Sequence, residues 1–374
     1  MIIINTDDLG YGDLGCYGSR AMKTPNLDRL ARQGMRFTDG YSCNALCSPS
    51  RFGLLTGRYP QRRGLDWPIW QENQPLGKKA VRAFGHVLGK MGLTDMGKES
   101  DVKRIPADEI TIAEALRLAG YRTGMVGKWH LGDFPVLPRY NPMKHGFDQF
   151  YDVPYSNGME PFPLYRGEKE LEADIRGQDQ AKLTRLYTKE AIKFLEENRN
   201  GPFFLYLAYT FPHRPIFASD KFRYGSDGGL YGDVVEELDF YTGKLLDRLK
   251  SLGLERNTMV IFTSDNGPWY YGYSGGLRSG KGQSFEGGFR VPMIIRWPQQ
   301  VAAGRTCDEP VMNLDFYPTL LKLAGLSVPN DRLVDGKDIS GLMMGTRKRS
   351  PHKALFFYHH DVLEGVRALA FKRL

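Results

Sequence analysis

Hydrophobic residues in this chain occur in two patterns, short apolar runs and longer stretches with a helical period. Apolar runs of strand length occupy residues 1–5, 122–126, 203–209, 259–263 and 291–297. In the clearest helical stretch, steps of three and four place on one face Leu230, Val234, Leu238, Tyr241, Leu245 and Leu249. Strands that alternate with helices predict an α/β fold, with a mostly parallel central sheet sandwiched by helices.

Local signals mark further helices. Thr24 precedes Pro25, which is typical of a helix start with Thr24 as the capping residue. Glycines at 120 and 325 favour helix ends at these points. Additional helices are therefore predicted at residues 111–119, 182–197 and 313–324.

The C-terminal part has a different pattern. Residues 328–345 contain Pro and Gly and are interpreted as a linker, and strands are expected at 355–360 and 366–373. We therefore predict one large domain over residues 1–346. Residues 347–374 are expected to begin a C-terminal α+β subdomain that is incomplete.

Composition limits the function classes. The chain has 374 residues, of which 41% are hydrophobic, so a large core is expected, and no apolar run approaches membrane-spanning length. Basic residues (51) exceed acidic ones (43), but no nucleic-acid motif accompanies the net charge of +8, and a basic surface suits any polyanion. The four cysteines do not indicate a disulfide framework. Cys43 and Cys47 do not indicate a zinc site, because the chain has no matching second pair.

The segment CSPSRFGLLTGR at residues 47–58 carries the strongest functional signal. Cys47 alone is as compatible with a buried structural thiol as with a catalytic residue. The whole segment resembles the signature of type I sulfatases, and the chain is most similar to the arylsulfatase A and N-acetylgalactosamine-6-sulfatase branch of the alkaline phosphatase superfamily. The resemblance implies that Cys47 is oxidised to formylglycine by a formylglycine-generating or an anaerobic maturation enzyme.

Oxygen ligands follow two of the predicted strands. Asp7 and Asp8 come after the first strand, and Asp265 and Asn266 after the strand at 259–263. Asp7 and Asp8 alone fit an ordinary turn or cap. Two such strand ends favour a site for a hard divalent cation, because ligands of open α/β sheets bind at the carboxyl ends of strands. The resemblance implies that these four residues bind Ca²⁺, or alternatively Mg²⁺, together with the modified Cys47.

Cationic residues complete the resemblance. Lys128 and His130 lie in GKWHLG, a second family signature, although a lone Lys-x-His is more typical of surface charge. Arg51 is a permanent cation beside the nucleophile. The resemblance implies that Lys128 contacts the sulfate and the nucleophile, and that His130 takes a proton when the intermediate collapses.

Three more residues match short family motifs. His213 follows a buried-strand pattern, and Lys281 lies in a Gly-rich segment that by itself would be a flexible loop. By resemblance His213 binds sulfate and protonates the leaving oxygen, while Lys281 grips the sulfate. Ser156, in Pro-Tyr-Ser, resembles a sulfate-contacting serine.

The resemblance thus implies an enzyme that hydrolyses sulfate monoesters through a formylglycine hydrate and an enzyme-bound sulfate. Alternatives are a phosphonate or phosphodiester hydrolase of the same superfamily and a non-catalytic binder of sulfated glycans. Because relatives usually carry export signals and this chain enters a strand at once, we expect a periplasmic or secreted parent and a chain trimmed before its first strand.

Two features favour a sulfated carbohydrate over a small aryl sulfate as the natural substrate, with aryl sulfates as synthetic substrates. Residues 61–104 are rich in cations, and an aromatic cluster follows Asn266, made of Trp269, Tyr270, Tyr271 and Tyr273. An anionic sugar can place its negative charges near the cationic segment and its ring faces against the aromatic cluster. The alternatives are a solvated loop and ordinary loop packing.

Overall fold

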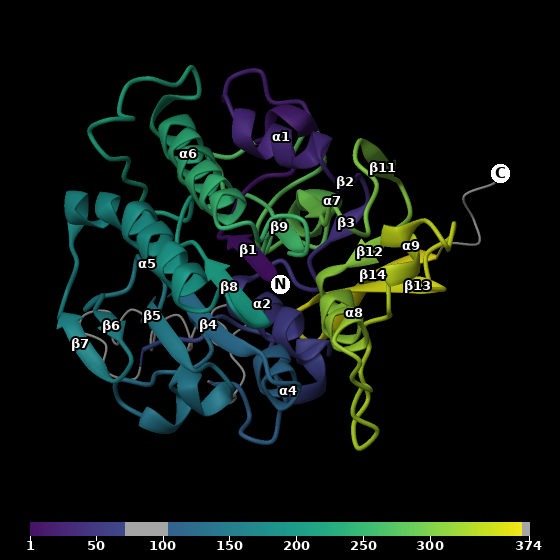
Figure 1. Cartoon of the computed structure of the whole chain (residues 1–374). Helices are drawn as coiled ribbons and strands as arrows, with labels where there is room; N and C mark the ends of the chain where they lie inside the picture. The colour runs from purple at the N-terminus through teal and green to yellow at the C-terminus, as the bar shows by residue number, and fades with distance from the viewer. Residues whose placement is uncertain (72–103, 369–374) are drawn as a thin grey trace, which may run out of the picture.

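The computed structural model describes residues 1–71 and 104–368. Within them, ten strands form one sheet in the order β11-β2-β10-β9-β1-β8-β4-β5-β6-β7 (Figure 1). The strands are β1 Ile2–Thr6, β2 Met35–Phe37, β4 Arg122–Lys128, β5 Gln149–Val153, β6 Leu164–Arg166, β7 Lys169–Glu172, β8 Phe203–Ala208, β9 Val260–Ser264, β10 Met293–Arg296 and β11 Arg305–Cys307. The five central strands, β9 to β5, run parallel, which confirms the predicted sheet.

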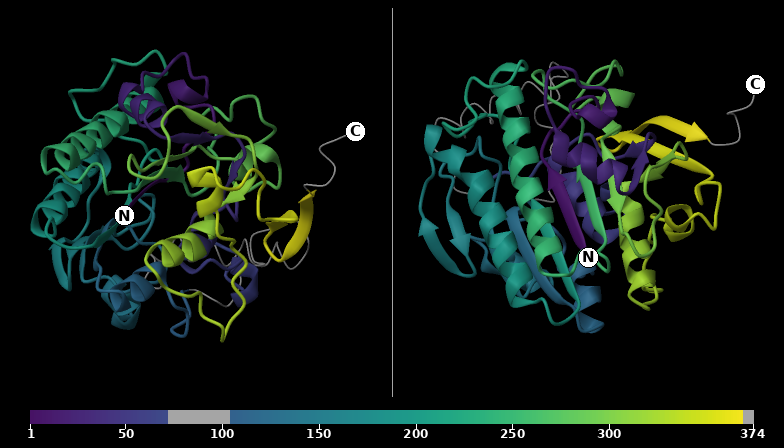
Figure 2. Two further views of the ribbon diagram at one scale, coloured as in Figure 1. Left: turned by 45° about the vertical axis from the view of Figure 1, so that its right-hand side comes forward. Right: turned by 45° about the horizontal axis from the view of Figure 1, so that its top comes forward.

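Helices cover both faces of this sheet (Figures 1 and 2). On one face lie α1 Pro25–Arg32, α5 Leu183–Glu197 and α6 Gly229–Ser251, and on the other α2 Cys47–Thr56, α4 Ile112–Leu118 and α8 Phe316–Leu323. Ile2 and Ile4 of β1 belong to the first core, whereas Ile3 belongs to the second. Because both faces of the strand are buried, β1 is a continuous apolar run without polar alternation.

Two predicted helix details were wrong. Thr24 does not cap α1 with its side chain; Asp239 of α6 accepts hydrogen bonds from the backbone N–H of Asn26 (3.0 Å) and of Leu27 (2.7 Å) instead. Leu230, assigned to the apolar face of α6, is 44% exposed, because the first turn of α6 borders an open cavity rather than the core. Val234, Leu238, Leu245 and Leu249 are buried as predicted.

The C-terminal part also differs from the prediction. The segment interpreted as a linker contains a short helix, α9 Ser340–Met344, whose residue Leu342 packs into the core. Strands β13 Ala354–His359 and β14 Val362–Ala368 form an antiparallel hairpin, yellow in Figure 2. β14 begins four residues earlier than predicted, because a two-residue turn with His360 at positive φ (54°) directly follows β13. The domain division at residue 346 stays a prediction.

A second, two-stranded sheet supports the hairpin. It pairs β3 Gly40–Tyr41 with β12 Val311–Met312. Tyr41 and Phe289 contact Phe357 of β13, at ring distances of 5.3 and 5.0 Å. The hairpin therefore packs on β3 and on the segment that ends at Phe289.

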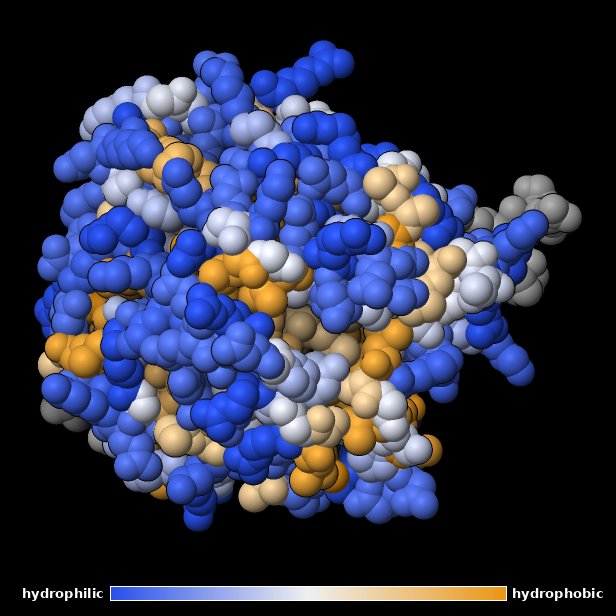
Figure 3. Space-filling model, viewed as in Figure 1, coloured by the Kyte–Doolittle hydropathy of each residue, from blue (hydrophilic) through white to orange (hydrophobic). Residues whose placement is uncertain are grey.

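The face of the molecule seen in Figure 3 is mainly polar. Figure 3 shows one face on which hydrophilic side chains predominate and apolar ones gather in small groups. Among the described residues, none of the helices has the length and apolarity to span a membrane. Most of the cationic segment 61–104 lies outside the described residues; of its described cations, Arg62 pairs with Asp335 (2.6 Å) and Arg63 with Asp108 (2.6 Å).

Candidate active site

The central strands bring most of the predicted residues together at one edge of the sheet. Each of the five parallel strands ends there, because parallel strands share the direction of their carboxyl ends. These ends carry Asp7 and Asp8 (β1), Asp265 and Asn266 (β9), Lys128 and His130 (β4), His213 (β8) and Ser156 (β5). Residues spread over more than 250 sequence positions thus form one site.

Helix α2 adds Cys47 and Arg51. The helix begins at Cys47, and the four-residue spacing places Arg51 on the same side one turn later. Ser42 holds the start of the helix against β9, because its hydroxyl donates to the Asp265 carbonyl (2.5 Å) and contacts the Ser50 hydroxyl (2.8 Å). The backbone N–H of Gly282 donates to the Ala45 carbonyl (2.9 Å), so the Lys281 loop lies beside the same helix start.

Oppositely charged side chains alternate in the buried part of the site. The Arg51 guanidinium pairs with Asp265 (2.8 Å) and lies 3.4 Å from Asp7. Lys128 pairs with Asp7, and Lys281 pairs with both oxygens of Asp8 (2.6 and 2.8 Å). Three carboxyl groups thus face three basic side chains, so the opposite charges largely balance.

The carboxyl groups differ in proton affinity. Burial and the adjacent Asp7 raise the pKa of Asp265 to about 7. Burial also opposes ionisation of Asp7, but Lys128 and the other nearby cations outweigh it and hold its pKa well below the usual range. Asp7 is therefore more firmly ionised than Asp265, and further positive charge would favour ionisation of Asp265 as well.

Gly127 explains how Lys128 reaches Asp7. It has a φ of 106°, and a Cβ there would lie 1.9 Å from the Ala208 carbonyl oxygen on β8. Only glycine fits this close approach. The end of β4 can therefore pass β8 closely and direct Lys128 toward the end of β1.

The two histidines are neutral at pH 7. Burial and Lys281 lower the pKa of His213 to about 4, and burial together with Lys128 lowers the pKa of His130 well below its usual value. His130 donates from Nε2 to the Ile69 carbonyl (2.8 Å), which leaves Nδ1 as a buried acceptor without a partner in residues 1–71 and 104–368. His130 thus presents an unprotonated ring nitrogen inside the site.

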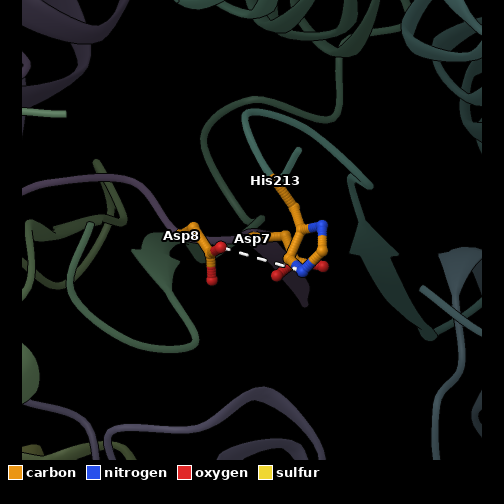
Figure 4. A group of neighbouring side chains, drawn as sticks. All are labelled: Asp7, Asp8 and His213. Carbon is orange, nitrogen blue, oxygen red and sulfur yellow. Dashed lines mark ion pairs between the residues drawn. The ribbon is translucent and has the colours of Figure 1, made fainter. Parts of the chain in front are cut away.

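The His213 ring is held from β5. Nδ1 donates to the Asn157 side-chain oxygen (2.8 Å), and the Ser156 hydroxyl lies 3.1 Å from Nε2. Nε2 also lies 3.8 Å from Asp8, and a dashed line in Figure 4 marks this contact. The sequence did not single out Asn157; its position directly after Ser156 was the available signal.

The acidic residues fit a hard divalent cation. Asp7, Asp8 and His213 offer ligand atoms that all lie within 4.8 Å of one another (Figure 4). Asp7 Oδ1 and Asn266 Oδ1 are buried and accept no hydrogen bond from any described residue. The Asn266 amide donates to Asp8 (2.8 Å), which leaves its oxygen as the acceptor for a ligand. A set of carboxylate and amide oxygens suits Ca²⁺ or Mg²⁺.

Comparison with known proteins identifies the family. The family model Sulfatase matches residues 1–326. The chain belongs to the sulfatase family. This sulfatase is 39% identical to mouse N-acetylgalactosamine-6-sulfatase over 98% of its own length and 70% of the mouse protein. It is 33% identical to mouse steryl-sulfatase, over 98% of the chain and 68% of the relative.

Solved structures give the same result. The sulfatase resembles Ps i-CgsB in complex with k-i-k-neocarrahexaose, with 32% identity and a TM-score of 0.78 over 95% of this chain and 78% of that one. It also resembles the PsFucS1 sulfatase from Pseudoalteromonas sp., with 28% identity and a TM-score of 0.84 over 98% and 76% of the two chains. Sulfatases are sulfuric ester hydrolases, and the predicted family, branch and enzyme class are confirmed.

Proposed function

We propose that this sulfatase hydrolyses sulfate monoesters of carbohydrates and that Cys47, converted to formylglycine, carries the nucleophile. The observation that supports this proposal is the convergence of Arg51, Lys128 and Lys281 on the Cys47 end of α2. A sulfate ester is anionic and repels a nucleophile, so the site must supply cations around the point of attack.

The thiol itself is poorly suited to this task. Burial raises the pKa of Cys47 despite the two lysines nearby, so the protonated form predominates at neutral pH. The hydrate of formylglycine supplies one hydroxyl that attacks sulfur and a second whose deprotonation releases sulfate from the enzyme. Conversion requires a maturation enzyme that oxidises Cys47, either with dioxygen or by an anaerobic route.

The side chains of the site have distinct proposed roles. Lys128, Lys281 and Ser156 bind sulfate oxygens, and Arg51 fixes the helix start through Asp265 and the Lys128 carbonyl (2.7 Å). His130 accepts a proton at Nδ1, the atom left free by its bond to Ile69. His213, held at Nδ1 by Asn157, faces the sulfate; the negative charge of the bound ester would favour protonation of its Nε2, and this proton would pass to the departing sugar oxygen.

We further propose Asp7, Asp8, Asp265 and Asn266 as ligands of Ca²⁺, with Mg²⁺ as the alternative. The opposite charges of the protein groups largely balance, as three carboxyl groups face three basic side chains. A divalent cation would make the site positive and would lower the repulsion felt by an anionic ester. The two buried oxygens without partners, on Asp7 and Asn266, support this assignment.

The preference for carbohydrate rests on relatives and on the site rim. One relative is named N-acetylgalactosamine-6-sulfatase, and one structural neighbour was solved in complex with k-i-k-neocarrahexaose. Tyr270, Tyr271 and Tyr273 are 87%, 61% and 53% exposed directly after the metal-ligand segment. Exposed aromatic rings at a site rim offer stacking faces to sugars.

Mass spectrometry and turnover test the proposal together. Active protein should contain a peptide in which Cys47 is replaced by the aldehyde, and the aldehyde fraction should track sulfate release. Cys47→Ala should abolish release from every sulfate ester, whereas Cys307→Ala, at the remote β11 edge, should not. Full activity with an unmodified Cys47 thiol would refute the mechanism.

A substrate panel separates the alternatives. Sulfated mono- and oligosaccharides should be turned over with higher kcat/KM than 4-nitrophenyl sulfate, and both faster than phosphodiesters and phosphonate monoesters. Faster phosphoester than sulfate-ester hydrolysis would favour the phosphonate or phosphodiester alternative. Saccharide binding without sulfate release by protein with matured Cys47 would favour a glycan binder.

A further inference from the structure

Two cavities flank the aromatic loop at residues 267–273. One, of about 380 Å³, is bordered by Trp269, Tyr270 and the proposed sulfate-binding Lys281. The other, of about 760 Å³, is bordered by Arg214, Tyr231 and Tyr271. The first cavity includes a sulfate-binding cation, whereas the second extends away from the reacting group and has no assigned role.

Arg214 connects the two cavities. Its guanidinium lies over the Trp269 ring, 4.8 Å from the ring centre, and Tyr270 packs edge-on against the same ring at 4.7 Å. Stacking on an aromatic face holds a guanidinium in place while its N–H donors stay available at the edge. Arg214 is thus a positioned cation and not a freely rotating surface side chain.

The charge of Arg214 is uncompensated in the part of the chain that the structure describes. No carboxylate in residues 1–71 and 104–368 lies within ion-pair distance of it, although it directly follows His213, whose ring lies 3.8 Å from Asp8. Some other arginines are paired, for example Arg223 with Asp220 (3.7 Å), whereas Arg214 is distinguished by its place directly after His213 and on the Trp269 ring. An exposed, unpaired and stacked arginine beside a catalytic residue is expected to meet an anion of the substrate.

We propose that Arg214 is a specificity-determining residue that binds a second anionic group, sulfate or carboxylate, of the sulfated saccharide whose ester is hydrolysed. The inference rests on the proposed function, because the first anion is the ester held by Lys281 and Lys128. Trp269 lines the cavity of Lys281 and carries Arg214 on its ring, so the two cations reach one saccharide from two sides. Tyr271, 61% exposed in the second cavity, offers a face to a neighbouring sugar.

The test compares ligands that differ by one anion. The probes are N-acetylgalactosamine 6-sulfate, its 4,6-disulfate, and the monosulfate linked to a uronic acid. Dissociation constants are measured with Cys47→Ala protein, which cannot turn over, and kcat/KM with the active enzyme. The protein with Arg214 should bind at least one dianionic probe more tightly than the monosulfate. The probe that is preferred identifies the second anion as sulfate or carboxylate.

Arg214→Gln should reduce this preference by about 10-fold, the lower end for a hydrogen bond to a charged group at an exposed site. The loss should appear in Kd and KM rather than in kcat, and Arg214→Lys should restore part of it. Arg223, nine residues later, is half-buried and pairs with Asp220 (3.7 Å); Arg223→Gln is the control and should leave the preference unchanged.

Two results have different meanings. Equal preference ratios for wild type and Arg214→Gln, or no preference for either dianionic probe, would overturn the inference about Arg214. Discrimination in binding by Cys47→Ala protein, with no sulfate release by the matured enzyme, would support Arg214 as an anion reader and refute the proposed function instead.

Discussion

Asp13 joins the loop that carries Asp7 and Asp8 to the aromatic loop. It is fully buried and accepts three hydrogen bonds, from the backbone N–H of Gly10 (2.6 Å), the backbone N–H of Tyr273 (2.7 Å) and the hydroxyl of Tyr231 (2.5 Å). Asp13→Ala removes all three acceptors at once. We therefore predict that this substitution loosens both loops without touching a proposed metal ligand.

The structure gives the size of the effect. Each bond contributes about 1 kcal/mol, and buried donors without an acceptor add to the cost, so Asp13→Ala should lower the free energy of unfolding by roughly 3–5 kcal/mol. An unfolding entropy of about 2.1 cal/mol/K per residue gives roughly 0.8 kcal/mol/K for 374 residues. The expected decrease in Tm is about 4–6 °C.

A graded series separates the bonds. Tyr231→Phe removes one donor and should cost about 1 kcal/mol, and Asp13→Asn keeps the shape but loses one backbone N–H bond, with a cost between the other two variants. Thermal unfolding of each variant, with kcat/KM on a sulfated saccharide, measures stability and function together. An Asp13→Ala protein that unfolds within about 1 °C of the wild type would refute the reasoning.

Three further predictions concern the metal, the pH dependence and a remote helix cap. Asp265→Asn should lower bound calcium or magnesium in elemental analysis, whereas Asp233→Asn, on α6, should not; stoichiometric zinc in the wild type would contradict the assignment. Burial lowers the pKa of His145 to about 4, below the value near 6.5 in the unfolded chain. Because only the unfolded chain binds a proton at this histidine between pH 6.5 and 4, the folded state loses stability as the pH falls through this range. The free energy of unfolding, measured by denaturant titration, should therefore fall between pH 7 and pH 5 by roughly 2 kcal/mol less in His145→Phe than in the wild type. The same fall in both proteins would contradict this role of His145. Asp239→Ala should lower the free energy of unfolding by about 2–3 kcal/mol, because the backbone N–H groups of Asn26 and Leu27 lose their acceptor. Asp247→Ala, which breaks an exposed ion pair with Arg29, should lower it by less than about 1 kcal/mol. Equal effects of the two substitutions would contradict the role of Asp239 as the cap of α1.

The site residues that the sequence predicted share a local signal. Asp7, Lys128 and Asp265 each lie at the end of an apolar run, and Cys47 lies in a long family signature. The end of a buried strand is visible in sequence because the apolar run stops there, and parallel strands bring such ends to one edge. The structure places all of these residues at that edge, while their chemical roles remain proposals.

Other features had no local signal. The cap of α1 comes from Asp239, more than 200 residues away, and not from Thr24 at the helix start. Arg62 and Arg63 looked like part of a free cationic segment, yet each pairs with a carboxylate distant in sequence. A charge pattern gives the number of cations but not which of them are already paired.

The amino-acid sequence by itself determined the α/β class, the strand ends and the family signature around Cys47, because these depend on apolar runs, helical spacing and contiguous motifs. The tertiary structure alone decided which polar groups meet. The stacking of Arg214 on Trp269 and the bonds of Asp13 to Tyr231 and Tyr273 join segments that the sheet order brings together. Burial is the physical reason, since it sets the pKa values of His130 and Asp265 and requires a partner for each polar atom, and the complete fold determines burial.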